Sequence, residues 1–236
     1  NHDCPTCRWA GRGTLMQPPL YVSPQQHMED RADFARAGIR RGQPVVFAST
    51  VQGIVSLTHN TSKSLFKLSE IYDRISWGAV GRYNEFEALR QAGIRFTDTR
   101  GYAYERSDVT ARGLANMYAR TLGELFISGA KPFEVELGVA EVGFTPETDR
   151  FYQISFDGTL LEHDGLLVLG GNEQELHQQL RSQLGDSVQE LSDTIEVIRQ
   201  VLGTTDTHVE LALLDRDPQS LRGTHRAFRR LDPQAF

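Results

Sequence analysis

The first candidates for a redox or metal-binding role along the chain are two cysteines, in the sequence Cys4-Pro-Thr-Cys7. A C-x-x-C pair can shuttle a disulfide or supply half of a zinc site. A redox pair of this kind needs a helix N-terminus to lower the thiol pKa, and the next expected helix begins only near Ser23. A closed zinc site needs four ligands, and His2 is the only further ligand nearby. We favour a tail without such a role, and deleting residues 1–15 without functional loss would exclude a redox or zinc module built on Cys4 and Cys7.

A lysine at the start of an expected strand is the second candidate. Lys67 lies in the sequence Ser64-Leu-Phe-Lys-Leu-Ser-Glu70. A lysine shielded from water can act as a base or a nucleophile, whereas a surface lysine does no chemistry. From composition alone the surface interpretation is favoured.

Other signatures of catalysis and nucleotide binding are missing from the sequence. Gly170-Gly171-Asn172 has neither the spacing of a dinucleotide fingerprint nor the lysine of a P-loop. The G-x-S-x-G elbow of a hydrolase does not occur. The seven histidines show no metal-ligand spacing. We therefore expect no cofactor.

Charge and composition exclude further classes of protein. The formal net charge is −6, which argues against nucleic-acid binding, because such proteins neutralise phosphates with Lys and Arg. No apolar run is long enough to cross a membrane, and residues 1–12 do not form a secretory signal. The body of the chain after Cys7 contains no cysteine, as expected for a cytoplasmic protein.

The chain of 236 residues suits one layered domain. We expect an extension over residues 1–22, the domain over 23–232 and a short tail over 233–236. Ser23, Pro24 and Gln26 predict a capped helix that ends at Gly38 or Gly42. Strands are then expected at 44–48 and 54–57 around a Gln-Gly turn, and another over 71–80.

Helices alternate with strands over the rest of the sequence. Two helices are predicted, at 84–91 and after Asp108, then strands over 133–139, 152–156 and 166–169. Two more helices follow, the second with a capping box of Ser187 and Glu190, and strands near 209–214 and 226–231 complete the chain. Strands joined by tight turns are antiparallel, and each sheet must bury a face. The order predicts an α+β fold, a four-layer αββα sandwich of two antiparallel sheets.

Several long segments of the sequence resemble proteasome alpha subunits of the actinobacterial type, and the resemblance spans about residues 18–232. They are Tyr21–Gln25, Ser69–Arg74, Gly81–Phe86, Asp98–Tyr104, Asp108–Asn116, Lys131–Leu137 and Arg226–Arg230. The resemblance implies the same αββα sandwich, which is the Ntn-hydrolase and proteasome-subunit fold. It also implies a homo-heptameric alpha ring stacked on beta subunits.

The same resemblance implies that the chain is a non-catalytic subunit. Proteolysis in this family belongs to beta subunits, which use an N-terminal threonine. Here Gly42-Gln-Pro44 stands at the start of the first strand, after a capped helix. Activation by the residue's own amine needs a free N-terminus at that position. The alternative is an autoprocessed N-terminal-nucleophile amidohydrolase on the same fold, which intact-mass analysis showing an unprocessed N-terminus would remove.

By resemblance, the chain gates the entrance for unfolded protein substrates. The segment before the first helix, with Pro18, Pro19, Leu20 and Tyr21, is expected to cover the axial pore. The loop Ser128-Gly129-Ala130-Lys131 matches the family's loop that lines the annulus behind it. Small residues there let ring-related backbones approach closely.

The resemblance gives Lys67 a better interpretation than a surface position. It matches the lysine in the pocket between neighbouring subunits, where AAA ATPase activators insert a C-terminal tail. A compact ammonium suits a terminal carboxylate. Gly81 matches a glycine of the pocket wall and Asp33 an acidic pocket residue. Family analogy further suggests substrates that carry the bacterial protein tag Pup.

Overall fold

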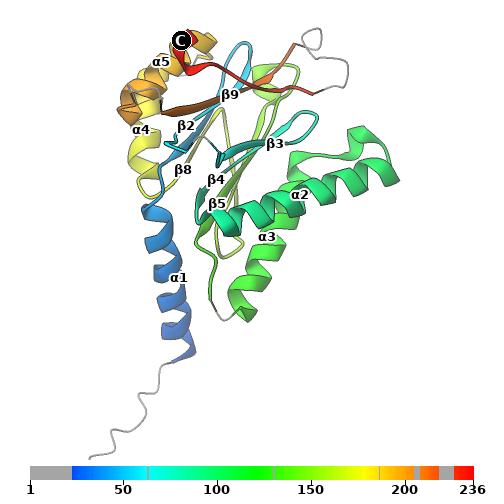
Figure 1. The fold of residues 1–236 in the computed structure, drawn as a ribbon, viewed down its shortest axis with the longest axis vertical. Coiled ribbons are helices and arrows are strands. Elements are labelled where there is room, and N and C mark those ends of the chain that lie inside the picture. The colour runs from blue at the N-terminus through cyan, green and yellow to red at the C-terminus, as the bar shows by residue number, and fades with distance from the viewer. Residues whose placement is uncertain (1–22, 63, 130, 186, 205–207, 218–225) are drawn as a thin grey trace, which may run out of the picture.

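The computed structural model of the chain (Figure 1) describes residues 23–62, 64–129, 131–185, 187–204, 208–217 and 226–236. Its helices are α1 (Pro24–Arg40), α2 (Tyr83–Ala103), α3 (Ala111–Ser128), α4 (Glu173–Leu184) and α5 (Leu191–Leu202). Its strands are β1 (Val45–Ser49), β2 (Gly53–His59), β3 (Leu68–Tyr72), β4 (Ile75–Gly81), β5 (Val135–Glu141), β6 (Arg150–Ile154), β7 (Leu160–His163), β8 (Leu166–Leu169), β9 (Val209–Asp215) and β10 (Phe228–Arg230).

The strands form two five-stranded sheets, with the orders β10-β9-β2-β1-β8 and β3-β4-β5-β6-β7. Every pairing between neighbouring strands is antiparallel. Helices α4 and α5 cover the outer face of the first sheet, and α2 and α3 cover that of the second (Figure 1). The predicted αββα sandwich is confirmed.

The space between the two sheets is filled around one aromatic ring. Phe47 on β1 is fully buried and points toward the second sheet. Opposite it stand Gly78 and Gly138, which are paired across β4 and β5. A Cβ atom at either glycine would lie 2.7 or 2.9 Å from ring carbons of Phe47. These two glycines therefore let the sheets approach closely over the ring.

Helix α1 closes one end of this space rather than covering a face. Ser23 accepts a hydrogen bond from the Gln26 amide (3.1 Å), as an N-cap should. Ala35 and Ile39 are buried in the core between the sheets. The first seven residues of the helix, by contrast, are exposed or half-buried, and the helix extends beyond the sandwich in Figure 1.

Several element boundaries differ from the sequence predictions. The single strand expected over 71–80 is two strands, β3 and β4, joined by a turn at Asp73 and Arg74. The helix expected at 84–91 continues to Ala103. It passes through Gly93 and Gly101, where the hydroxyls of Tyr118 and Tyr72 occupy the space of a side chain. Packing against these tyrosines therefore overrides the low helix propensity of glycine.

Two predicted helix caps were wrong. Helix α3 is capped by Thr110, which accepts from the Gly113 amide (3.2 Å), while Asp108 caps the short turn before it. Helix α5 begins after Glu190, whose side chain does not cap it and instead accepts a hydrogen bond from Gln52. In both places a nearer hydroxyl or a tertiary partner displaces the cap expected from spacing alone.

Among the residues that the structure describes, no helix is long and apolar enough to cross a bilayer. Residues 233–235 form a short 3₁₀ turn. Arg199 on α5 donates to the carbonyl oxygens of Pro233 (2.8 Å) and Phe236 (2.6 Å). The last residues are thus packed against the outer helix layer.

Candidate functional site

Lys67 directly precedes β3, at the point where α1 passes into β1. Its side chain is half-buried, and its ammonium donates a hydrogen bond to the Gln43 carbonyl oxygen (3.3 Å). Burial lowers the pKa of Lys67, and the charge of Glu210 offsets part of that effect. The structure therefore holds a partly dehydrated cation close to the first strand.

The main chain around Lys67 is fixed on both sides. The amides of Lys67 and Leu68 donate to the two carboxylate oxygens of Glu210, each at 2.9 Å. The Lys67 carbonyl accepts from the Ala79 amide on β4 (3.2 Å). The sequence prediction that Lys67 lies at the start of a strand is confirmed, and β9 and β4 set its position.

Lys67, Gln43 and Ala79 meet at one corner of the sandwich. Gly81 is the last residue of β4, two residues after Ala79. Its φ of 121° lies in the region that favours glycine, and a Cβ there would overlap the Glu134 carbonyl oxygen. A Cβ on Gly42 would lie 3.3 Å from the Gly81 amide nitrogen. Gly81 thus lies beside Gly42, the residue before the Gln43 that Lys67 contacts, and the structure gives Gly81 a backbone role that resemblance did not suggest.

Asp33 is not brought to this corner within one chain. Its side chain is 78% exposed and pairs with Arg36 one turn further along α1 (3.1 Å). Seven helical steps separate it from Arg40, the last residue of α1, which is about 10 Å along the axis at 1.5 Å per residue. Asp33 could therefore share a pocket with Lys67 only if the two came from different copies of the chain.

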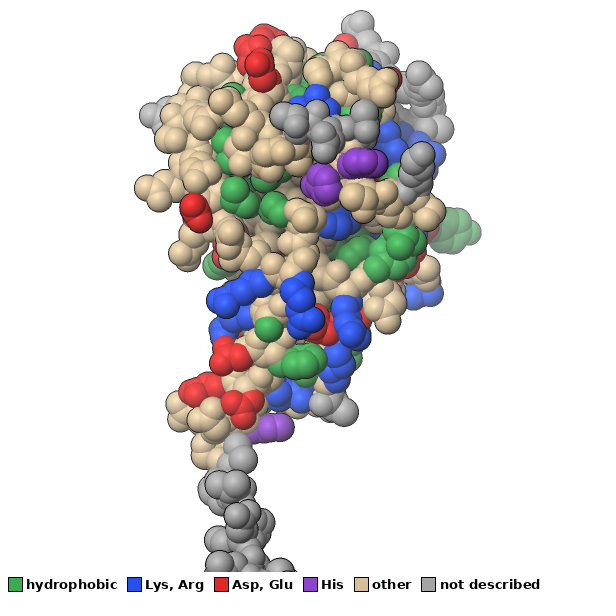
Figure 2. All heavy atoms as spheres, turned by 60° about the vertical axis from the view of Figure 1, so that its left-hand side comes forward, with side chains coloured by type: hydrophobic (Ala, Val, Ile, Leu, Met, Phe, Trp, Pro, Cys, Tyr) green, Lys and Arg blue, Asp and Glu red, His purple; other side chains and the backbone are tan. Residues whose placement is uncertain are grey.

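Charge is divided along the exposed side of α1. In Figure 2 acidic side chains lie toward the N-terminal half of α1 and basic ones around its C-terminal end. The exposed acids are Glu29, Asp30 and Asp33, and the exposed bases are Arg36, Arg40 and Arg41. Cations at the C-terminal end also complement the helix dipole. The end of α1 nearest Lys67 is therefore strongly positive.

The predicted annulus loop begins at the end of α3. The Ser128 hydroxyl donates to the Glu124 carbonyl (2.6 Å), and the Gly129 amide to the Leu125 carbonyl (2.8 Å). The Lys131 ammonium lies 2.5 Å from Glu85 and 3.0 Å from Glu134. Burial is the largest single effect and lowers the pKa of Lys131, but the bonds and charges of the two carboxylates together outweigh it and raise the pKa. Lys131 is thus an anchored, charged side chain.

Three sets of predicted residues cannot be placed. Ala130 of the annulus loop, the gate residues Pro18, Pro19, Leu20 and Tyr21, and the pair Cys4 and Cys7 lie outside the described residues. Within the described ranges, no group of three or more His, Cys, Asp or Glu side chains is arranged to hold a metal ion.

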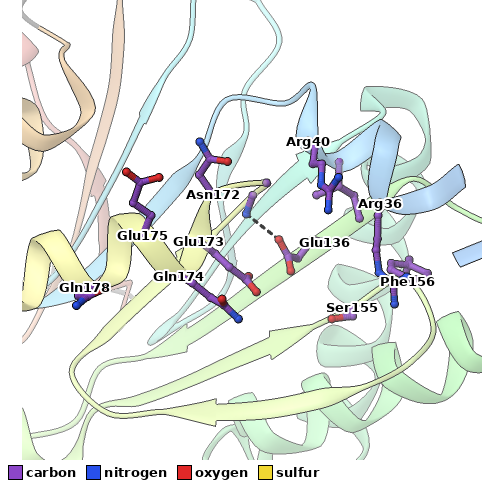
Figure 3. A pocket seen from close by; sticks show the side chains of 13 residues that line it. Arg36, Arg40, Glu136, Ser155, Phe156, Asn172, Glu173, Gln174, Glu175 and Gln178 are labelled. Atoms are coloured by element: carbon purple, nitrogen blue, oxygen red, sulfur yellow. Dashed lines mark hydrogen bonds between the residues drawn. The ribbon is translucent and has the colours of Figure 1, made fainter. Parts of the chain in front are cut away.

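A separate hollow lies between α1, β5 and the start of α4 (Figure 3). Glu136 and Glu173 point into it, with Arg36 on the α1 side. The Gln153 amide nitrogen donates to Glu136 (2.8 Å) and to Glu173 (2.6 Å). Burial is the main cause that raises the pKa of Glu136, to about 7. The charge of the nearby Glu173 raises it as well. The hollow thus contains two close acidic groups held by one amide.

Comparison with known proteins decides the family. A family model described as "Proteasome subunit" matches residues 36–212. A "Proteasome subunit alpha" of Renibacterium salmoninarum is 48% identical over 224 residues, covering 92% of this chain and 93% of the relative. A second, from Paenarthrobacter aurescens, is 48% identical and covers 93% and 96%, and a third, from Kineococcus radiotolerans, is 45% identical and covers 92% and 94%. The chain belongs to the proteasome subunit family. The predicted resemblance to actinobacterial alpha subunits is confirmed.

As an alpha-type proteasome subunit, the chain is of the non-catalytic class, and the start of β1 agrees with this. The main chain runs from α1 through Gln43 and Pro44 into Val45. The buried Thr58 hydroxyl on the neighbouring strand donates to the Pro44 carbonyl (2.7 Å). The amidohydrolase alternative, which needed a nucleophile with a free amine here, is replaced by the alpha assignment.

Sequence reasoning about this proteasome subunit missed Glu210 and Arg230. Arg230 on β10 donates to Glu210 (2.8 Å) and to the Leu68 carbonyl (2.8 Å). A signal was present, because Glu210 is the only charged residue in the apolar run of β9 that precedes Asp215. A charge in such a strand needs a buried partner.

Proposed function

We propose that this proteasome subunit forms the outer, homo-heptameric alpha ring of a core particle, controls substrate access and docks an AAA ATPase. Beta subunits would supply the proteolysis. The family match and the alpha-type relatives support membership of the particle. The ring stoichiometry, the ATPase, Pup-tagged substrates and a cytoplasmic location follow by family analogy.

The docking role rests on one observation, the half-buried position and single main-chain contact of the Lys67 ammonium. Its ammonium is half-buried and donates to one main-chain carbonyl, that of Gln43. An ammonium has three donors, so a carboxylate could bind it while the Gln43 contact persists. A charge-assisted bond to a terminal carboxylate would compensate the dehydration that lowers its pKa. Gly81 borders the same corner, and Asp33 would join it from a neighbouring subunit.

The gating role is assigned to two segments near α1. In the sequence, residues 18–21 end three positions before Pro24, the start of α1, whose first turns extend beyond the sandwich. The annulus is assigned to residues 128–131, where Lys131 also lies 5.7 Å from the centre of the Phe34 ring on α1. Helix α1 therefore links the gate segment, the annulus loop and the corner that contains Lys67.

Replacing Lys67 by Ala in the particle assembled with beta subunits tests this proposal. We expect ATPase-stimulated degradation of a folded protein to be lost, while cleavage of a small fluorogenic peptide is unchanged. Arg120→Ala, which removes an exposed cation of α3 that pairs with Glu124 on the same helix, is the control and should retain both activities. Unchanged stimulated degradation by the Lys67 variant would refute the docking role, and a chain that never binds beta subunits would refute the assembly role.

A further inference from the structure

The loop that carries Lys67 is tied to the sandwich by one buried carboxylate. Glu210 is 7% exposed and accepts four hydrogen bonds. The donors are the Asn60 side chain (2.9 Å), the amides of Lys67 and Leu68, and Arg230. Because β9 belongs to one sheet and β3 to the other, this carboxylate joins the two sheets at the point where Lys67 is displayed.

Two further contacts, made by Asn60 and Arg230, hold the main chain around the lysine. Asn60, which bonds Glu210, also donates to the Leu65 carbonyl (2.7 Å) and so closes the loop. The Arg230 guanidinium lies 4.0 Å from the centre of the Phe66 ring. Phe66 and Leu68, on either side of Lys67, are thus held by the same arginine. The main chain on both sides of Lys67 is thus held by hydrogen bonds to Glu210, Ala79 and Arg230.

We propose that Glu210 is a positioning residue of the docking site, which fixes the main chain of Lys67 and supplies the negative charge that favours its ammonium form. This inference rests on the proposed docking role of Lys67. A preordered cation loses less conformational freedom when a carboxylate binds, so affinity is higher. The nearby charge also keeps the partly dehydrated lysine protonated.

The charges that face Lys67 come from a few elements. Glu210 on β9 favours the ammonium, and Arg230 on β10 shares the same carboxylate. His59 on β2 and His208 before β9 lie at this end of the strands, with ring centres 6.5 Å apart. When the Glu210 charge is removed, burial still lowers the pKa of Lys67 and that charge no longer offsets it. The pKa of Lys67 therefore falls further. Binding that needs charged Lys67 should then be lost at a lower pH.

The test uses assembled particles and a fluorescein-labelled decapeptide copying the C-terminus of the AAA ATPase encoded in the same genome. Its Kd is measured by anisotropy from pH 6 to pH 10.5, with the C-terminal amide as the probe control. Glu210→Gln should weaken binding about tenfold or more at pH 7 and move the alkaline loss of binding to lower pH. Asp215→Asn is the matched control, since Asp215 is a buried carboxylate at the other end of β9 that pairs with an arginine of β10, Arg229.

Glu210→Asp separates the effect of the charge from the effect of its position. It also provides the test if the Glu210→Gln subunit does not assemble. It keeps the charge but shortens the reach, so binding should weaken while the alkaline limb stays near that of the wild type. The chain has three lysines, Lys63, Lys67 and Lys131, so NMR of ¹³C-methylated lysines can follow the titration of Lys67 directly.

The outcomes are distinguishable. If Lys67→Ala abolishes binding while both Glu210 variants keep the wild-type Kd and pH profile, the positioning role is overturned and the docking role stands. If Lys67→Ala itself leaves binding unchanged, the docking proposal fails first. A Glu210→Gln variant that weakens binding equally at every pH, with the Lys67 titration unmoved, would overturn the charge effect.

Discussion

The Lys67 ammonium lies 3.3 Å from the carbonyl oxygen of Gln43, two residues before β1. A cation from the β2–β3 loop is therefore bonded to the main chain that joins α1 to β1. A ligand that draws the ammonium away must compete with this bond. The contact places the proposed docking group in direct touch with the base of α1, the helix that follows the proposed gate.

The identity of the cation should matter as well as its charge. Lys67→Arg keeps a positive charge but replaces a compact ammonium by a planar guanidinium, at a half-buried position beside the Gln43 carbonyl. We expect the activator tail to bind about tenfold more weakly, a loss of about 1.4 kcal/mol. Anisotropy with the labelled tail peptide measures this, with Arg120→Lys on the exposed side of α3 as control. Wild-type affinity in the Lys67→Arg particle would show that charge alone suffices.

Gly81→Ala should destabilise the subunit for reasons unrelated to a ligand. The new Cβ is strained at φ 121° and overlaps the Glu134 carbonyl oxygen. Gly165→Ala is the matched control, because Gly165 has φ 70° with nothing within 4 Å of its Cβ. We expect roughly 1 kcal/mol for Gly165→Ala, a fall in Tm of about 2–4 °C, and at least twice that for Gly81→Ala. Equal shifts in thermal denaturation would contradict a backbone role for Gly81.

The layer architecture was predictable from the sequence because it depends on local patterns. Strict alternation over residues 133–139 and the Asp157-Gly158 turn between β6 and β7 indicate antiparallel strands, and these strands pair in that way. The division of residues 68–81 into two strands was not predictable. The turn at residues 72–74 contains no glycine or proline that would mark it in the sequence. The Arg74 side chain instead donates to the Val142 carbonyl (2.9 Å), which is far away in sequence.

The candidate site was predictable only where a long motif carried it. Lys67 and Gly81 were found by resemblance, whereas spacing alone left Lys67 as a surface residue. Glu210 and Arg230 come from the last two strands, more than 140 residues after Lys67, and no local pattern connects them. Such pairs become visible only when the two sheets are packed together.

Arg31 should control how firmly α1 is attached. Its buried guanidinium donates to the Phe126 carbonyl at the end of α3 (2.7 Å) and lies over the Phe126 ring. Arg31→Met keeps the apolar stem but leaves that carbonyl without this donor, at a cost of about 1–3 kcal/mol. Amide hydrogen exchange in α1 should accelerate while β1 and β5 remain protected. Arg36→Met, which loses an exposed ion pair and a 5.7 Å contact with the Phe156 ring, should change exchange far less than Arg31→Met.

Glu136 should make the stability of the subunit depend on pH near neutrality. Burial raises its pKa from 4.5 to about 7 in the folded chain. Between these values the folded state binds more protons than the unfolded state, so the free energy of unfolding falls as pH rises. The slope is at most about 1.4 kcal/mol per pH unit. The penalty is complete and constant only when Glu136 is fully ionised in the folded chain, about one pH unit above that pKa.

Glu136→Gln removes this titration and should flatten the dependence of Tm on pH between 5 and 8. Burial lowers the pKa of His163 and of His177, and these groups contribute with the opposite sign as pH rises. The comparison is therefore the difference between variant and wild type at each pH, in which the histidine effects largely cancel. Glu175→Gln, an exposed carboxylate at the same hollow, is the control. A wild-type pH slope in the Glu136→Gln protein would show that the buried carboxylate is not the group responsible.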